Sequence, residues 1–139
     1  MKDTRQLNLQ SSADEVYRIE SFVDDLKQWL GFGDDTYSKI MLALSEAVNN
    51  AIVHGNRKDT DKEVRIDAWC SSNNLNISVK DEGEGFNPDK LPDPLKEENL
   101  LKEGGRGVFL IKQYCDAVEY KDGGSRIVMS FNLNSTERL

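Results

Sequence analysis

The sequence predicts an α+β fold, a two-layer sandwich with helices packed on one face of a mixed, mostly antiparallel sheet. Two segments, about 13–30 and 34–53, carry apolar residues at helical spacing. Five short segments instead alternate apolar and polar residues, as half-buried strands do: about 5–10, 64–69, 75–79, 116–120 and 127–133. The order of strand, two helices, two strands, long loop, helix and two strands is typical of helices covering one side of a sheet.

The ends of these helices and the turns between strands also have sequence signals. Ser11 and Ser12 precede the first helix and offer capping oxygens, and Gly31 follows its last apolar residue. The second helix is apolar on nearly every side, which predicts a buried helix, and Gly55 and Asn56 end it. The SSNN run at 71–74 predicts a hairpin, and Gly123-Gly124 predicts a turn before the last strand.

Length and charge limit the function. A chain of 139 residues buries one sizeable core, so we expect a single domain over residues 1–139. The formal charge of −7 argues against binding to bare nucleic acid, which needs Lys and Arg against phosphates. No segment approaches the roughly 20 apolar residues of a membrane span, and the first ten residues lack the apolar core of a signal peptide. We therefore expect a cytoplasmic protein without a membrane partner.

Polar residues interrupt the second helix near its end. Glu46, Asn50 and His54 are spaced i, i+4 and i+8 and so share one face. A carboxylate and an amide one turn apart suit a site in which the amide oxygen holds a divalent metal and the carboxylate orients a hydroxyl. The alternative is a satisfied hydrogen-bond network between helix and sheet, with His54 as a structural cap.

A second polar cluster, Asp81-Glu82-Gly83-Glu84-Gly85, comes directly after a predicted strand. Its two glycines allow a flat ring to approach the backbone, and Asp81 can accept a hydrogen bond from an exocyclic amine. This chemistry suits adenine, and the alternatives are a calcium loop and a plain acidic turn. A calcium loop of the EF-hand type is excluded, because its third, fifth and twelfth positions would fall on Gly83, Gly85 and Pro92.

The third cluster, Gly104-Gly105-Arg106-Gly107, opens a predicted helix. Backbone N–H groups at a helix N-terminus form an anion site, and Arg106 adds a positive charge. No strand precedes it and no GK[ST] follows, so it fits neither the dinucleotide fingerprint nor the P-loop. A metal helix, an adenine loop and a phosphate cradle, in this order, together indicate one nucleotide site.

These motifs resemble those of the GHKL (Bergerat-fold) ATPases. SEAVNNAIVHGN is similar to their N box, DEGEGF to their G1 box and GGRGVFLI to their G2 box, with residues 87–103 in the position of the ATP lid. The short length, the EAVNNAIVHGN wording and the GRGVFLI ending are most similar to the anti-sigma-factor serine kinases of partner-switching systems. The histidine-kinase members need a phosphoacceptor histidine, and the single histidine here lies inside the N box.

The resemblance implies roles for individual residues. Asn50 would coordinate the Mg²⁺ that bridges the ATP phosphates, and Glu46 would be the catalytic base for the attacking hydroxyl. The remaining implied contacts are Asp81 with the adenine amine, Gly83 and Gly85 around that pocket, Gly105, Gly107 and Arg106 with the phosphates, and Ser125 as an assistant of Asp81.

The resemblance also implies a function. It would make the chain an ATP- and Mg²⁺-dependent protein serine kinase that sequesters a sigma factor, phosphorylates an antagonist protein and forms a homodimer. The alternative is a nucleotide-gated protein-binding module without significant kinase activity. Glu46 favours the kinase, because a pure binder does not need a base at that position.

Overall fold

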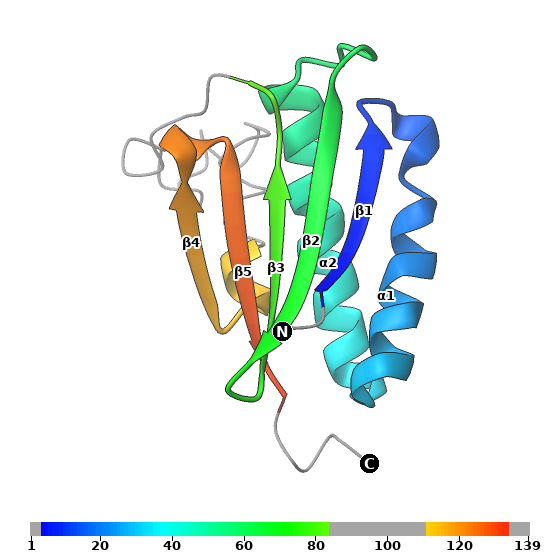
Figure 1. The fold of residues 1–139 in the computed structure, drawn as a ribbon, viewed down its shortest axis with the longest axis vertical. Helices are drawn as coiled ribbons and strands as arrows, with labels where there is room; N and C mark the ends of the chain where they lie inside the picture. Colours follow the sequence, from blue (N-terminus) through cyan, green and yellow to red (C-terminus); the bar gives the residue numbers. More distant parts are fainter. Residues whose placement is uncertain (1–3, 84–110, 134–139) are drawn as a thin grey trace, which may run out of the picture.

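The computed structural model of the chain describes residues 4–83 and 111–133, which are the coloured parts of the ribbon in Figure 1. The helical pattern expected from Gly107 onward falls partly in this range, and residues 111–114 are helical. The start of that helix lies outside the described residues.

The strands form one sheet in the order β1-β2-β3-β5-β4. Every pairing between described strands is antiparallel, so the sheet expected to be mixed is antiparallel as far as it is described. One face carries the apolar residues of the alternating pattern, and the register sets Leu9 beside Val64, Ile66 beside Val79, and Ile77 beside Met129. The strands are β1 (Thr4–Gln10), β2 (Glu63–Ser71), β3 (Asn74–Lys80), β4 (Ala117–Lys121) and β5 (Arg126–Asn132).

Two helices, α1 (Arg18–Leu30) and α2 (Asp34–Asn50), pack together on this apolar face (Figure 1). The α+β two-layer prediction is confirmed. The start of α1 was placed about five residues too early, because a 3₁₀ turn (Ala13–Glu15) precedes the helix. The Ser12 hydroxyl accepts from the Asp14 N–H at 3.2 Å, so this capping oxygen organises the 3₁₀ turn and not the α-helix.

Helix α2 is not buried on all sides, which corrects the expectation from its composition. Ile40, Ala43 and Leu44 are at 0% exposure, but Leu42 is 49% exposed. In a two-layer sandwich the sheet covers one side of such a helix and its neighbour covers another, so the outer side faces solvent. Apolar content alone therefore overstated the burial.

Directly after α2 the helix changes from α-helical to π-helical winding. Residues Ala51–Gly55 form a π turn, in which the Asn56 N–H donates to the Ala51 carbonyl oxygen at 2.8 Å. Single π turns are rare and occur frequently at functional sites. Because a π turn rotates successive residues less than an α turn, His54 does not continue the line from Glu46 to Asn50. His54 is exposed, whereas those two residues are half-buried.

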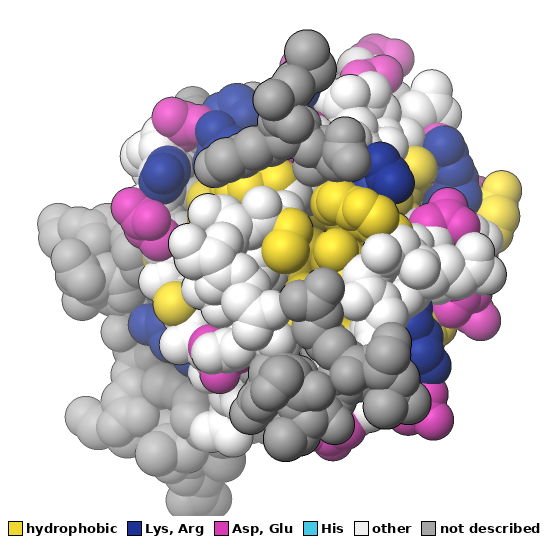
Figure 2. Space-filling view, turned by 60° about the horizontal axis from the view of Figure 1, so that its bottom comes forward, with side chains coloured by type: hydrophobic (Ala, Val, Ile, Leu, Met, Phe, Trp, Pro, Cys, Tyr) yellow, Lys and Arg dark blue, Asp and Glu magenta, His cyan; other side chains and the backbone are white. Residues whose placement is uncertain are grey.

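The chain direction brings several segment ends together at one end of the sandwich. Strand β1, helix α2 with its π turn, and strand β3 all end there, and β2 begins there (Figure 1). Figure 2, turned to bring the opposite end forward, shows hydrophobic side chains gathered near its centre with charged residues around them. Within residues 4–83 and 111–133, no helix is long and apolar enough to cross a membrane.

Prediction for the fold. Gly31 has φ 73° and ends α1 with a hydrogen bond from its N–H to the Lys27 carbonyl oxygen at 2.7 Å. An L-residue in this left-handed conformation is strained by about 1–2 kcal/mol. We expect Gly31→Ala to lower the free energy of unfolding by about that amount, measured by urea denaturation. Gly33→Ser is the control, because Gly33 has φ −86° and extended geometry and is the N-cap of α2, a position at which serine is favoured. Equal losses in the two variants would contradict this explanation.

Candidate functional site

The side chain of Asn56 lies at the centre of the end where these segments meet. It is 0% exposed. Its Nδ2 donates to the Ser11 hydroxyl at 2.7 Å and to the Glu63 carbonyl oxygen at 3.0 Å, and its Oδ1 accepts from the Glu82 N–H at 2.7 Å. One amide thus connects the end of β1, the start of β2 and the loop after β3.

Gly55 packs against this same loop. A Cβ atom at Gly55 would overlap the carboxyl group of Asp81, and a Cβ at Gly83 would overlap the carbonyl group of Gly55. Neither glycine is required by a positive φ, so close approach is the reason for both. The end of the N box and the start of the G1 box are therefore in direct contact.

Asp81 itself is held by its neighbours. Its N–H donates to the Ser125 carbonyl oxygen at 2.9 Å, and its Oδ1 accepts from the Gly83 N–H at 2.8 Å. Burial raises the pKa of the Asp81 carboxyl above its usual value, while the Gly83 hydrogen bond and the charges of Lys80 and Lys62 oppose this rise. A half-buried carboxylate between glycines can accept a hydrogen bond from the edge of a flat ring.

Ser125 adjoins Asp81 through its main chain. Its hydroxyl donates to the Asp122 carbonyl oxygen at 3.0 Å and accepts from the Lys80 ammonium at 3.4 Å. In the described structure the side chain of Ser125 thus supports the turn between β4 and β5, and its carbonyl group fixes the position of Asp81.

Glu46 and Asn50 lie one turn apart on α2, as their spacing predicted, and both are half-buried. Asp81, Gly83 and Ser125 are described above, and the remaining candidate residues are not covered by the structure. Gly85, Gly105, Arg106 and Gly107, with the lid at 87–103, lie outside the described residues. The described part of the site therefore consists of the two α2 residues, the Gly55-Asn56 pair, and the Asp81 loop.

The hydrogen bonds of Asn56 were not predicted from the sequence. The sequence predicts only that Gly55 and Asn56 end the helix, because glycine and asparagine are common at helix C-termini. The signal that could have been used is that Asn56 is the last residue of the N-box run SEAVNNAIVHGN, and that an amide side chain offers both donors and an acceptor for hydrogen bonds to neighbouring segments.

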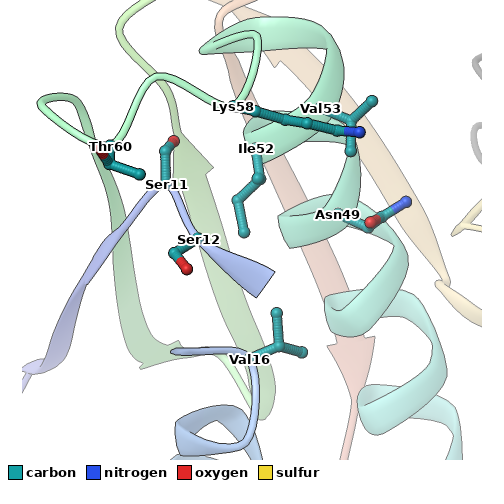
Figure 3. A pocket seen from close by; sticks show the side chains of 8 residues that line it. All are labelled: Ser11, Ser12, Val16, Asn49, Ile52, Val53, Lys58 and Thr60. Carbon is teal, nitrogen blue, oxygen red and sulfur yellow. The ribbon is translucent and has the colours of Figure 1, made fainter. Parts of the chain in front are cut away.

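A cavity of about 290 Å³ lies next to this site, between the end of β1 and the π turn. Figure 3 shows Ile52 and Val16 pointing into it from the two sides. None of Glu46, Asn50 and Asp81 lines it, so it is separate from the candidate site. Its lining residues are Ser11, Ser12, Val16, Asn49, Ile52, Val53, Lys58 and Thr60.

The sequence profile of the histidine kinase-like ATPase domain matches residues 9–131, which is most of the chain. The chain therefore belongs to this family, and the resemblance seen in the three motifs is confirmed. A chain containing the RsbU and RsbW domains of a Mycobacterium tuberculosis protein has the same fold, with a TM-score of 0.67 and 16% identity over 94% of the present chain. The present chain spans 32% of that solved chain.

Two curated relatives are more similar in sequence. An anti-sigma F factor of Clostridium perfringens is 35% identical over 101 residues, which cover 69% of this chain and 72% of the relative. A serine-protein kinase RsbW of Listeria monocytogenes is 24% identical over 144 aligned positions, covering 99% of this chain and 92% of the relative. One is named as an anti-sigma factor and the other as a serine-protein kinase, and these are the two activities that the motif resemblance implied.

Prediction for the glycine contact. Gly55→Ala places a Cβ on the Asp81 carboxyl group, and overpacking of this kind costs about 1–3 kcal/mol. In an Asp81→Ala background the overlapping atoms are absent, so the same change should cost much less. Urea unfolding of the four proteins in this double-mutant cycle measures the difference. If Gly55→Ala costs the same in both backgrounds, the contact is not the reason for the glycine.

Prediction for pH. Burial raises the pKa of Asp81 in the folded protein, whereas in the unfolded chain the pKa of this group is near 3.8. The folded protein therefore binds the Asp81 proton more tightly than the unfolded chain does. Ionised Asp81 therefore destabilises the folded state at neutral pH, and this cost vanishes below 3.8. We expect Asp81→Asn to be more stable than wild type at pH 7 and the gap to shrink as the pH falls.

Urea unfolding at a series of pH values checks this expectation. Asp25→Asn serves as the control for the substitution itself, because Asp25 is exposed on α1 and its replacement should change stability little. A gap between Asp81→Asn and wild type that stays constant with pH would show that burial of the charge is not the cause.

Proposed function

We propose that this chain is an ATP-dependent anti-sigma factor and protein serine kinase that sequesters a sigma factor and phosphorylates a serine of its antagonist protein. The observation that carries the proposal is the Asp81 carboxylate, which is set between Gly55 and Gly83 at the same end of the sandwich as the last turn of α2. The names of the relatives support the two activities, since one is an anti-sigma F factor and the other a serine-protein kinase.

The described residues fit an adenine ring. A Cβ at Gly55 would overlap the Asp81 carboxyl group and a Cβ at Gly83 would overlap the Gly55 carbonyl group, so the two glycines allow the chain to pack closely around Asp81. Asp81 would accept a hydrogen bond from the exocyclic amine, with Gly85 completing the pocket and Ser125 holding the Asp81 main chain from behind.

The phosphates would lie toward α2. Asn50 has an amide oxygen of the kind that Mg²⁺ accepts as a ligand, and the half-buried position of Asn50 leaves it partly open to solvent. Mg²⁺ would neutralise phosphate charge. Gly105 and Gly107 would donate backbone N–H groups to the phosphates, Arg106 would stabilise the γ-phosphate, and residues 87–103 would form the lid.

Glu46 would act as the base. In the transfer, the serine hydroxyl oxygen of the antagonist forms a bond to the γ-phosphorus, the bond from that phosphorus to the bridging oxygen breaks, and ADP leaves. The hydroxyl proton goes to the Glu46 carboxylate, which lies one helical turn before Asn50. A homodimeric state and a cytoplasmic location complete the proposal on the basis of the family resemblance.

Prediction for the transfer. Glu46→Gln keeps the shape of the side chain but removes the base, and loss of a general base costs about 10²–10⁴-fold in rate. We expect its affinity for Mg·ATP, measured by calorimetry, to stay near that of wild type. We expect the rate at which this variant transfers labelled phosphate to serine, measured in a heat-treated extract of the source cells, to fall by that factor.

Glu119→Gln is the matched control, because this exposed glutamate on β4 is remote from α2. It should transfer phosphate at the wild-type rate. Transfer by Glu46→Gln at the wild-type rate would remove the base assignment. Nucleotide binding without transfer by the wild-type protein would favour a nucleotide-gated protein-binding module.

A further inference from the structure

We propose that Asn56 is a positioning residue that sets the selectivity of the site for adenine, because it fixes the loop that carries Asp81. This inference rests on the proposed function, in which Asp81 recognises the exocyclic amine of ATP. Asn56 would not touch the nucleotide. It would act through the main chain of Glu82, the residue between Asp81 and Gly83.

The first support is the hydrogen bond from the Glu82 N–H to the Asn56 Oδ1 at 2.7 Å. Asp81 is held on one side by the Ser125 carbonyl group, through its own N–H at 2.9 Å. Asn56 holds the next peptide group along the chain. The two bonds together fix the direction in which the Asp81 side chain leaves the backbone.

The second support is that the Asn56 amide can take only one orientation. Its two N–H donors are used by the Ser11 hydroxyl and the Glu63 carbonyl oxygen, at 2.7 and 3.0 Å. A rotated amide would turn its oxygen toward the Glu63 carbonyl oxygen and its NH₂ group toward the Glu82 N–H. Both contacts are repulsive, so the acceptor must face the Asp81 loop.

The third support is steric. Gly55, which precedes Asn56, lies so close to the Asp81 carboxyl group that no Cβ fits between them, and the Gly55 carbonyl group lies equally close to Gly83. Gly55 therefore packs against the Asp81 carboxylate and Gly83, and Asn56 binds the peptide N–H of Glu82 between them. Asn56 is also 0% exposed, so solvent cannot replace its bonds without opening this end of the sandwich.

A merely structural role for Asn56 makes a different prediction. If Asn56 only stabilised the fold, its loss would lower the folded fraction and weaken the binding of every nucleotide by one factor. If it positions Asp81, its loss removes the discrimination between nucleotides that differ at the amine. ITP is the matched probe, because inosine has a carbonyl oxygen where adenosine has the amine, and a carboxylate repels that oxygen.

The experiment is calorimetric titration of the full chain with Mg·ATP and with Mg·ITP. For wild type we expect ATP to bind about 10- to 100-fold more tightly than ITP, as expected for one hydrogen bond to a charged acceptor. Asn56→Ala should lower this ratio by about tenfold or more. Ser11→Ala removes a partner on the far side of the amide but keeps the Glu82 bond, so it should lose stability and keep the ratio.

Hydrogen exchange of the Glu82 amide, followed by NMR without nucleotide, tests the bond directly. This amide should exchange faster in Asn56→Ala and at the wild-type rate in Ser11→Ala. Should Asn56→Ala not fold, Asn56→Ser is the second variant, since its short side chain keeps a polar group at this buried position but does not reach the Glu82 N–H.

The two levels of the proposal fail in different ways. An Asp81→Ala variant that keeps the wild-type ratio of ATP to ITP affinity would show that Asp81 does not recognise the amine, and the proposed nucleotide assignment would fail. Loss of the ratio in Asp81→Ala together with its retention in folded Asn56→Ala would overturn the positioning role alone. Loss of the ratio in Ser11→Ala as well would assign the effect to general loosening of the fold.

Discussion

A single buried amide, the side chain of Asn56, holds together the end of the molecule where the candidate site lies. A buried polar group without partners costs free energy, and this one makes all three of its side-chain hydrogen bonds to different segments. Displacing any one of these segments would leave both the Asn56 amide and the hydrogen-bonding group of that segment unsatisfied. The β1 end, the β2 start and the Asp81 loop are therefore fixed relative to one another by the same constraint.

Helix α2 serves the core and the site at once. Its Ile40, Ala43 and Leu44 are fully buried against the sheet and α1, and they fix the helix in position. Glu46 and Asn50 are on a half-buried part of the same helix, so their side chains are placed by a rigid element. The π turn that follows lets the chain bend into Gly55 and Asn56, which reach the loop after β3.

Asp81 combines a proposed functional role with a stability cost. Burial raises the pKa of its carboxyl group, which means that the folded structure disfavours the charge the site is proposed to use. The Gly83 N–H and the Ser125 carbonyl group hold the residue in place despite this cost. Such a trade between stability and activity is common where a charged group must stay available to a ligand.

The sequence by itself determined the elements whose signals are local. Alternation located the five strands, and SSNN and Gly123-Gly124 located turns at which Ser72, Asn73 and Gly123 have positive φ. The motif order also determined the family. The tertiary structure alone decided the π turn, the contact of Gly55 with Asp81 and the hydrogen bonds of Asn56. Its partners Ser11 and Glu82 are 45 and 26 positions away, and residue periodicity carries no information about contacts over such separations.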